Sequence, residues 1–267
     1  MKRNATSSHP ADLHLPEAPR LVRPTRLQVA HVQKRGLEAS RRALLGGLLA
    51  GSAAALGGCD SSNPRTGFLG AMERFNHRFQ AWLFDPEQLA PEEPHAALTP
   101  PAAFPAYFIS PVVPRAPRTW RLKVGGLVER PASFTVEELQ QLPRTEYRIR
   151  HHCVEGWTAV AAWTGVSIRD LASHVGASPA AHYVDFRSFD FGYWSSWDRP
   201  SAFHPQTILA YGRNGDPLPP EYGAPLRLYS GVKLGYKMVK YLTEVNFLPA
   251  PTGGYWEDRG YEWFAGV

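Results

Sequence analysis

The run Arg150-His151-His152-Cys153-Val154-Glu155-Gly156-Trp157 contains one of the two cysteines of this 267-residue chain. The other, Cys59, follows an export leader described below and has a different expected role. Cys153 is therefore left without a disulfide partner in the body of the chain. Such a thiol is a small buried apolar residue, a nucleophile or a metal ligand. Cys153 is the first candidate functional residue.

An export leader is predicted over residues 1–58. Ser40-Arg41-Arg42-Ala43-Leu44-Leu45 is a twin-arginine pattern, and an apolar, glycine- and alanine-rich stretch follows it. That stretch, residues 43–58, is shorter than the ~20 apolar residues of a membrane span, so no permanent transmembrane helix is expected. Leu56-Gly57-Gly58-Cys59 resembles a lipoprotein processing box, which predicts a lipid anchor at Cys59. The alternative is an ordinary signal peptide in which Cys59 is incidental.

The leader also accounts for the net charge of +5. It holds nine basic and three acidic residues, which leaves 20 of the 29 basic and 21 of the 24 acidic side chains for the rest. The mature protein is nearly neutral, so its charge gives no argument for nucleic acid or anionic lipid as a partner. Twin-arginine export carries folded proteins. It therefore predicts a periplasmic or extracytoplasmic location and favours a cofactor inserted before export.

The residues after the leader suffice for one well-buried domain. We divide them into a tether with an N-terminal amphipathic helix at 59–100 and a main domain at 101–267. The apolar spacing over 67–84 predicts the helix. We expect it to pack on its own domain, the alternative being a partner or membrane-surface role. The proline-rich stretch 85–117 is predicted to be an ordered surface loop anchored by Tyr107-Phe108-Ile109.

Short strands and short helices alternate in the main domain. Thr135-Val136-Glu137-Glu138 is a capping box that opens a helix to about Leu142. Ser167 caps a second helix, which ends at Gly176. Strands are predicted at 119–124, 147–151, 182–189, 226–229 and 239–247. The mixture predicts an α+β domain with long irregular connections, and neither a dinucleotide fingerprint nor a P-loop is present.

Three motifs in order resemble one family. Cys153-Val154-Glu155-Gly156-Trp157 after a basic strand resembles the molybdenum-ligating segment of the sulfite oxidase-like molybdopterin enzymes. It is most similar to the periplasmic methionine-sulfoxide reductase catalytic subunit branch, whose motif runs C-V-E-A-W. The stretches 214–228 and 231–240 are also similar to that family. The resemblance implies the sulfite oxidase molybdopterin-domain fold for 101–267, with mixed β-rich sheets and short helices.

The same resemblance implies a Mo-molybdopterin cofactor and two-electron oxygen-atom transfer on a small sulfoxide-, sulfite- or similar substrate. Cys153 would ligate the molybdenum, and a soft thiolate suits such a metal. We expect Arg148 and Arg150 to lower the pKa of Cys153 and favour the thiolate. The neighbouring histidines point to opposite faces of a strand and cannot both chelate a metal. One of them can donate a hydrogen bond to the cofactor.

A buried terminal phosphate of the cofactor would need cationic partners. The resemblance places Arg227 and the loop with Lys233 and Lys237 there, while Ser230 and Gly235 would let backbone amides approach. The alternative is a solvated basic face.

The remaining cofactor contacts implied by the resemblance are spread along the chain. Glu155 would lie near the open face of the metal, unless it caps a turn. The 190–198 loop is a candidate substrate-side wall, the alternative being ordinary core packing. At Tyr222 the chain departs from the family, which has Asn or His there. The other candidate contacts are Tyr107, Phe108 and Ser188.

The chain has no C-x-x-C-H haem motif, so a separate redox partner is expected, either a membrane haem protein or a cytochrome. A monomer is expected, because the last predicted strand is not followed by the dimerisation domain of the sulfite oxidase branch. Two other classes stay open. One is a cell-envelope enzyme of the transpeptidase type, in which His151 or His152 activates Cys153. The other is a non-catalytic binding lipoprotein.

Overall fold

The computed structural model describes residues 67–267 except 191. The predictions for the leader, for Arg41 and Arg42, for Cys59 and for residues 60–66 lie outside these described residues. The described residues belong to one compact unit, Ser61–Val267. Within them, no helix combines the length and apolar character needed to cross a bilayer.

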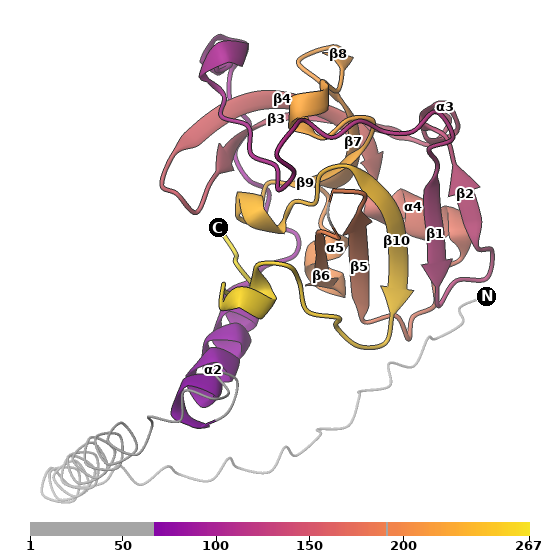
Figure 1. Ribbon diagram of the computed structural model, residues 1–267. Coiled ribbons are helices and arrows are strands. Elements are labelled where there is room, and N and C mark those ends of the chain that lie inside the picture. The colour runs from indigo at the N-terminus through magenta and orange to yellow at the C-terminus, as the bar shows by residue number, and fades with distance from the viewer. Residues whose placement is uncertain (1–66, 191) are drawn as a thin grey trace, which may run out of the picture. The chain divides into compact units, whose positions relative to one another are not determined.

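Two β-sheets form the unit, which together with the short helices confirms the predicted α+β class (Figure 1). The first has the order β2-β1-β10-β5-β6, and β1 and β10 are parallel while the other neighbours are antiparallel. Its strands are β1 (Leu122–Gly126), β2 (Ala132–Phe134), β5 (Tyr183–Ser188), β6 (Trp194–Asp198) and β10 (Leu242–Leu248). The second is antiparallel, in the order β3-β4-β7-β8, with β9 paired to β7. Its strands are β3 (Arg144–His152), β4 (Thr158–Ser167), β7 (Thr207–Arg213), β8 (Asp216–Pro217) and β9 (Arg227–Ser230).

The described helices are short apart from α2 (Gly67–Leu83). The short α-helices are α3 (Val136–Leu139), α4 (Ile168–Val175) and α5 (Arg199–Ala202). The two predicted caps are confirmed. Thr135 and Glu138 exchange capping-box hydrogen bonds at the start of α3, although this helix ends three residues earlier than predicted. Ser167 accepts a hydrogen bond from the backbone of Asp170, and left-handed Gly176 ends α4 with φ = 68°.

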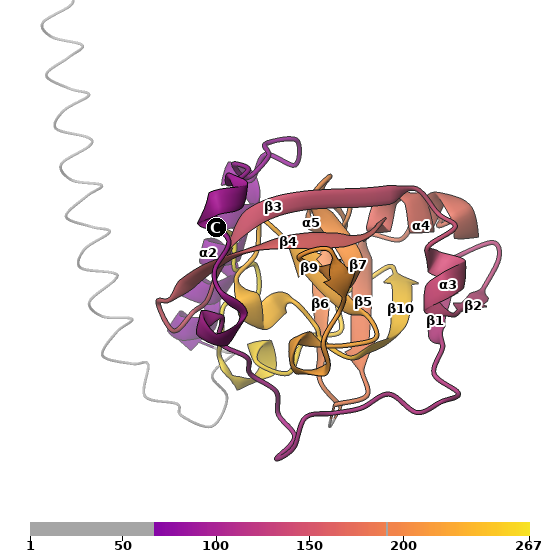
Figure 2. The same ribbon diagram turned by 90° about the horizontal axis from the view of Figure 1, so that it is seen from above.

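Five strands were not predicted, namely β2, β4, β6, β7 and β8. Every residue of β4 after Thr158 is buried, so the strand shows no alternation of apolar and polar residues. It is also rich in alanine and glycine, which have low strand propensity. Gly165 is required there, because a Cβ atom would lie 2.2 Å from the carbonyl oxygen of Leu209 on β7. β4 and β3 form the long curved pair seen from above in Figure 2.

The predicted helix at 67–84 is confirmed as α2, but its apolar side does not pack on the domain. Exposed apolar residues of this helix are Met72, Phe75, Phe79, Trp82 and Leu83, and Trp82 is 76% exposed. The helix is attached through Asn76, which bonds Glu262, and through His77, whose ring lies 4.6 Å from that of Trp263. The following stretch crosses the second sheet, where the amide of Glu93 donates to the carbonyl of Arg148.

Candidate active site

One pocket gathers most of the residues predicted for the site. It encloses about 1030 Å³ of space free of protein atoms, part of it open to solvent. Its walls come from the 104–109 loop, the end of β3, the turn after β5, the start of β9, the 235–241 segment and the C-terminal segment. The predicted residues that line it are Tyr107, Phe108, Cys153, Glu155, Ser188, Tyr222, Arg227 and Gly235.

A tight turn between β3 and β4 presents the thiol of Cys153. The amide of Gly156 donates to the carbonyl of Cys153 (3.0 Å), and the amide of Cys153 donates to the carbonyl of Trp157 (3.1 Å). Gly156 has φ = 88°, which favours glycine. Glu155 accepts a hydrogen bond from the Trp157 indole (2.8 Å), and its carboxylate lies 3.8 Å from the Cys153 sulfur. The half-buried thiol therefore faces the pocket beside one fixed carboxylate.

The expectation that Arg148 and Arg150 lower the pKa of Cys153 is wrong. Along β3 both arginines alternate with the buried residues Ile149 and His151. Arg148 donates to the carbonyl of Glu93 (2.7 Å), and Arg150 forms an ion pair with the carboxylate of the same residue. Burial raises the pKa of Cys153, the backbone amide of Glu155 opposes this rise and the carboxylate of Glu155 adds to it. A thiolate here would therefore depend on a bound metal, which deprotonates a coordinating thiol.

His151 forms part of the apolar floor of the pocket. Its ring lies 5.4 Å from that of Trp157 and 5.8 Å from that of Tyr229. Burial lowers the pKa of His151 to about 3, so its ring is neutral at physiological pH. Nδ1 of this ring has no hydrogen-bond partner in the described part of the chain. A Cβ atom on Gly235 would lie 2.7 Å from Nε2, so glycine lets the backbone approach the ring.

Arg227 places a buried positive charge in the pocket. Its guanidinium donates to the carbonyl of Tyr222 (3.1 Å) and lies over the ring of Trp163. Burial lowers the pKa of Arg227 to about 10, so the group remains charged at neutral pH. Within residues 67–267, leaving 191 aside, no carboxylate pairs with it. Burying an unpaired cation lowers the stability of the folded protein unless a bound anion pairs with it.

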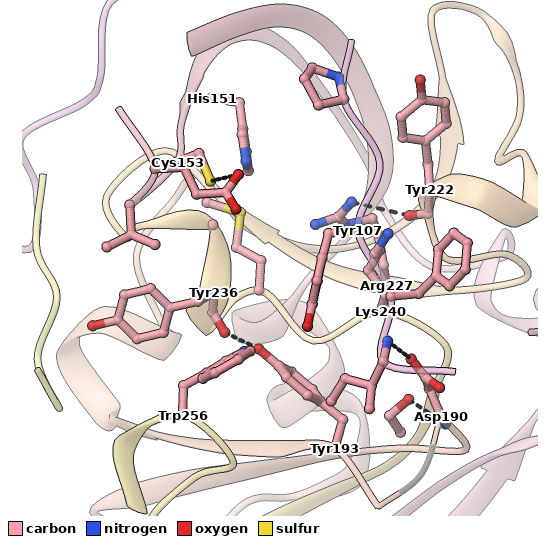
Figure 3. A pocket seen from close by; sticks show the side chains of 18 of the residues that line it. Tyr107, His151, Cys153, Asp190, Tyr193, Tyr222, Arg227, Tyr236, Lys240 and Trp256 are labelled. Atoms are coloured by element: carbon pink, nitrogen blue, oxygen red, sulfur yellow. Dashed lines mark hydrogen bonds between the residues drawn. The ribbon is translucent and has the colours of Figure 1, made fainter. Parts of the chain in front are cut away.

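Lys240 is a second cation at the pocket, and it was not predicted. Its ammonium donates to the carbonyl of Glu221 (2.8 Å). Burial, with the charge of Arg227, lowers the pKa of Lys240 to about 7, while Asp190 and Glu221 oppose this shift. Figure 3 shows Arg227 and Lys240 across the pocket from Cys153.

Lys233, Lys237 and Ser230 do not line the pocket. Lys237 is buried in an ion pair with Glu257 and donates to the carbonyl of Ser196 (3.1 Å). Lys233 donates to the carbonyl of Phe264 (2.6 Å) and lies 3.2 Å from the centre of that ring. The hydroxyl of Ser230 shares a hydrogen bond with that of Thr207 (2.8 Å). The two lysines hold the C-terminal segment, because their ammonium groups bind protein atoms.

That C-terminal segment supplies an aromatic wall that was not predicted. The ring of Trp256 lies 5.0 Å from that of Tyr261 and 6.4 Å from that of Tyr107. Tyr236 continues the wall, 5.2 Å from Tyr261. Glu257 lies between Trp256 and Tyr261 in the sequence and holds the wall in place. Its carboxylate pairs with Lys237 and accepts a hydrogen bond from Ser195. Nothing local in the 254–261 sequence signals this placement.

Of the predicted 190–198 wall, Asp190 and Tyr193 line the pocket, whereas residues 194–198 form β6.

We predict that Lys237→Met lowers the free energy of unfolding by about 3–5 kcal/mol, because it leaves the buried carboxylate of Glu257 without its cation. Urea unfolding measures this loss. The matched control is Arg144→Met, which removes an exposed pair with Glu146 and should cost less than about 1 kcal/mol. Equal losses in the two variants would contradict a stabilising role for the buried pair.

The 107–110 loop is held by the turn after β5. The Asp190 carboxylate accepts hydrogen bonds from the amides of Ile109 (2.9 Å) and Ser110 (3.0 Å). Ser188 accepts a hydrogen bond from the amide of Asp190 (2.8 Å). The hydroxyl of Tyr222 donates to the carbonyl of Phe104 (2.8 Å), so that hydroxyl already has a protein partner.

The pocket fits an anionic group that carries its own metal ligands. Among the described residues no three His, Cys, Asp or Glu side chains are placed to hold a metal, so a metal bound by Cys153 needs ligands from outside the protein. The unsatisfied Nδ1 of His151 and the unsatisfied hydroxyl of Tyr241 both lie on the lining residues. With the unpaired charge of Arg227, these atoms match a polar, negatively charged cofactor.

Comparisons with known proteins agree with this chemistry. The family model described as oxidoreductase molybdopterin binding domain matches residues 110–256. A putative protein-methionine-sulfoxide reductase subunit, YedZ1 of Azospira oryzae, is 41% identical over 234 residues, which cover 86% of this chain and 88% of that protein. The protein-methionine-sulfoxide reductase catalytic subunit MsrP of Xanthomonas axonopodis is 36% identical over 154 residues, 52% of this chain and 48% of that one. The chain thus matches about half the length of MsrP.

Among solved structures, the sulfane dehydrogenase SoxCD of Paracoccus pantotrophus is similar, with a TM-score of 0.47 and 24% identity. The match covers 50% of this chain and 39% of that one.

Proposed function

The chain belongs to the oxidoreductase molybdopterin-binding domain family, and from this premise we propose that its pocket reduces a sulfoxide by oxygen-atom transfer. It is a molybdopterin-dependent oxidoreductase, as the motifs around Cys153 and Arg227 imply. The observation that supports the site most strongly concerns Arg227. It is buried, forms no ion pair with a carboxylate among the described residues and lines the same pocket as Cys153. A cofactor with an anionic end and a metal end fits both.

The residues would divide the binding of the cofactor between them. Cys153 would supply a thiolate to the molybdenum, and Arg227 with Lys240 would hold the anionic end. Asp190 would position the 107–110 loop over the cofactor, because it binds two amides of that loop. When bound, the molybdenum and its dithiolene supply the two-electron redox chemistry. The protein supplies the thiolate, the cationic partners and a pocket that limits water.

Two features support a neutral sulfoxide as the substrate. The similar protein of Azospira oryzae is named as a putative protein-methionine-sulfoxide reductase subunit, and that of Xanthomonas axonopodis as the catalytic subunit of such a reductase. The aromatic wall of Tyr236, Trp256 and Tyr261 suits a sulfur-bearing apolar group, since sulfur packs favourably on aromatic edges. The charged side chain beside Cys153 is the carboxylate of Glu155, which would repel an anion. The reaction consumes two electrons and two protons, and it releases a thioether and water.

The electrons would come from a separate redox partner, a membrane haem protein or a cytochrome. The twin-arginine pattern at Ser40–Leu45 supports export in the folded state to the outside of the cytoplasmic membrane, and Cys59 supports a lipid anchor there. A monomer remains our expectation.

The experiment is to purify the exported protein and measure molybdenum and pterin per chain, then to follow oxidation of a reduced viologen dye by methionine sulfoxide. We expect about one molybdenum per chain and turnover with the sulfoxide. Sulfite with a ferricyanide acceptor tests the opposite direction. Full molybdenum content with turnover of sulfite alone would overturn the proposed substrate, and absence of molybdenum would overturn the site.

We predict that Trp256→Ala lowers kcat/KM for methionine sulfoxide by about ten- to hundredfold, mainly through KM, as for a lost apolar pocket contact. Steady-state kinetics at equal molybdenum content measures it. Trp82→Ala is the matched control, because that indole is exposed on α2 and does not line the pocket. An unchanged KM in Trp256→Ala would remove the aromatic wall from the substrate site.

A further inference from the structure

The exposed side of α2 carries a continuous apolar stripe. Its members recur at helical spacing and cover an arc of roughly 100°. Phe75 is 61% exposed and Trp82 is 76% exposed, which is unusual for rings of this size in water. We call this surface the α2 stripe, and it consists of Met72, Phe75, Phe79, Trp82 and Leu83.

Nothing in the described part of the chain covers the rings of the α2 stripe. The ring of Phe79 lies 6.1 Å from that of Phe75 and 5.9 Å from that of Trp82, so the stripe's rings contact one another. The helix cannot roll to bury them without losing the bonds of Asn76 to Glu262 and the contact of His77 with Trp263. Figure 1 shows α2 beside the C-terminal segment and away from both sheets. The attachment therefore holds the stripe outward.

We propose that the α2 stripe inserts into the surface of a lipid bilayer, with α2 lying in the plane of the membrane. Phenylalanine, tryptophan and leucine on one face, with arginine along the border, are typical of interfacial helices. Arg74 and Arg78 are exposed and lie along one border of the stripe. A single convex helix face suits a bilayer, into which side chains insert separately, better than a protein partner, which needs a complementary groove.

The position of α2 in the sequence supports a bilayer as the occupant. Gly67, its first residue, follows Cys59 by eight residues, which span at most about 28 Å when fully extended. If Cys59 is acylated, as proposed above, the helix cannot be far from lipid. Stable membrane attachment usually takes two signals, and the α2 stripe would be the second. This step alone rests on the proposed anchor, because the exposure of the stripe does not depend on it.

The test uses the exported holoenzyme bound to vesicles of phosphatidylcholine whose acyl chains carry bromine, which quenches tryptophan emission. The difference in quenching between the wild type and Trp82→Phe reports insertion of Trp82, since both proteins keep an aromatic ring there. We expect the wild type to be quenched more. We expect Phe75→Ser/Phe79→Ser to abolish this excess, and Leu89→Ser/Val112→Ser, which alters exposed apolar side chains elsewhere, to preserve it.

Flotation of unacylated protein with the same vesicles gives a second readout. We expect the Phe75→Ser/Phe79→Ser change to lower vesicle partitioning at least about tenfold, with little dependence on salt because insertion is apolar. Molybdenum content and turnover should not change, which separates this proposal from the proposed function. Equal quenching of the wild type and Trp82→Phe would overturn it. So would a dimer in solution that the same double change dissociates, because the stripe would then bind a second copy.

Discussion

Cys153→Ser is expected to lower sulfoxide turnover by about a thousandfold or more, equivalent to ~4 kcal/mol of transition-state stabilisation, while most of the pterin stays bound. The serine hydroxyl is far less acidic than the thiol and is a harder ligand, so it does not replace the thiolate. The cationic end of the pocket, with Arg227 and Lys240, is unchanged in this variant. Turnover and pterin content per chain are the two measurements.

Cys59→Ser is the matched control, since it removes the other cysteine of the chain, which lies outside the described residues. It should keep its turnover per molybdenum. Near-normal turnover in Cys153→Ser would show that Cys153 is not the ligand. The half-buried thiol would then be a small packing residue at the turn after β3.

The second large effect is expected in Arg227→Ala, which should be purified mostly without cofactor. Removing one partner of a buried ion pair costs about 3–5 kcal/mol, and here the partner lost would be the guanidinium proposed to bind the anionic end of the cofactor. Arg227→Lys should retain part of the cofactor, because an ammonium keeps the charge but lacks the fork of donors. Molybdenum and pterin per chain are measured in each variant.

Lys237→Met separates loss of cofactor from loss of stability. Lys237 is as deeply buried as Arg227 but binds Glu257 outside the pocket, so this variant should be less stable and still contain molybdenum. Full occupancy in Arg227→Ala would place that residue outside the cofactor site. Equal loss of cofactor in both variants would mean that occupancy follows stability alone.

The sequence predicted those parts of the fold that local chemistry specifies. α4 was predicted with its bounds, because Ser167 and Gly176 cap it by contacts within one turn. β4 was missed, because burial on both faces removes the alternation that marks a strand. Its identity depends on packing between β3 and β7, which no local pattern shows.

The same limit applies to the site. Cys153 and Arg227 were found by motif and line one pocket. Lys237 and Lys240 are three residues apart in one basic run, and the sequence could not tell which of them faces the pocket. Lys237 ends the short 3-10 helix Gly235–Lys237 and pairs with Glu257, whereas Lys240 follows this helix and lines the pocket. Trp256 and Tyr261 were missed because only long-range contacts bring them there.

The placement of Trp256 and Tyr261 has a consequence for the timing of biosynthesis. The pocket combines residues from 104–109 with residues more than 140 positions later in the order of translation. Its wall cannot close until Glu257 has been synthesised and has reached Lys237. A nascent chain on the ribosome would therefore present an open half-site, and the cofactor would be retained only after translation has passed this point. Loading of the metal would then be a late event, after synthesis of the C-terminal segment.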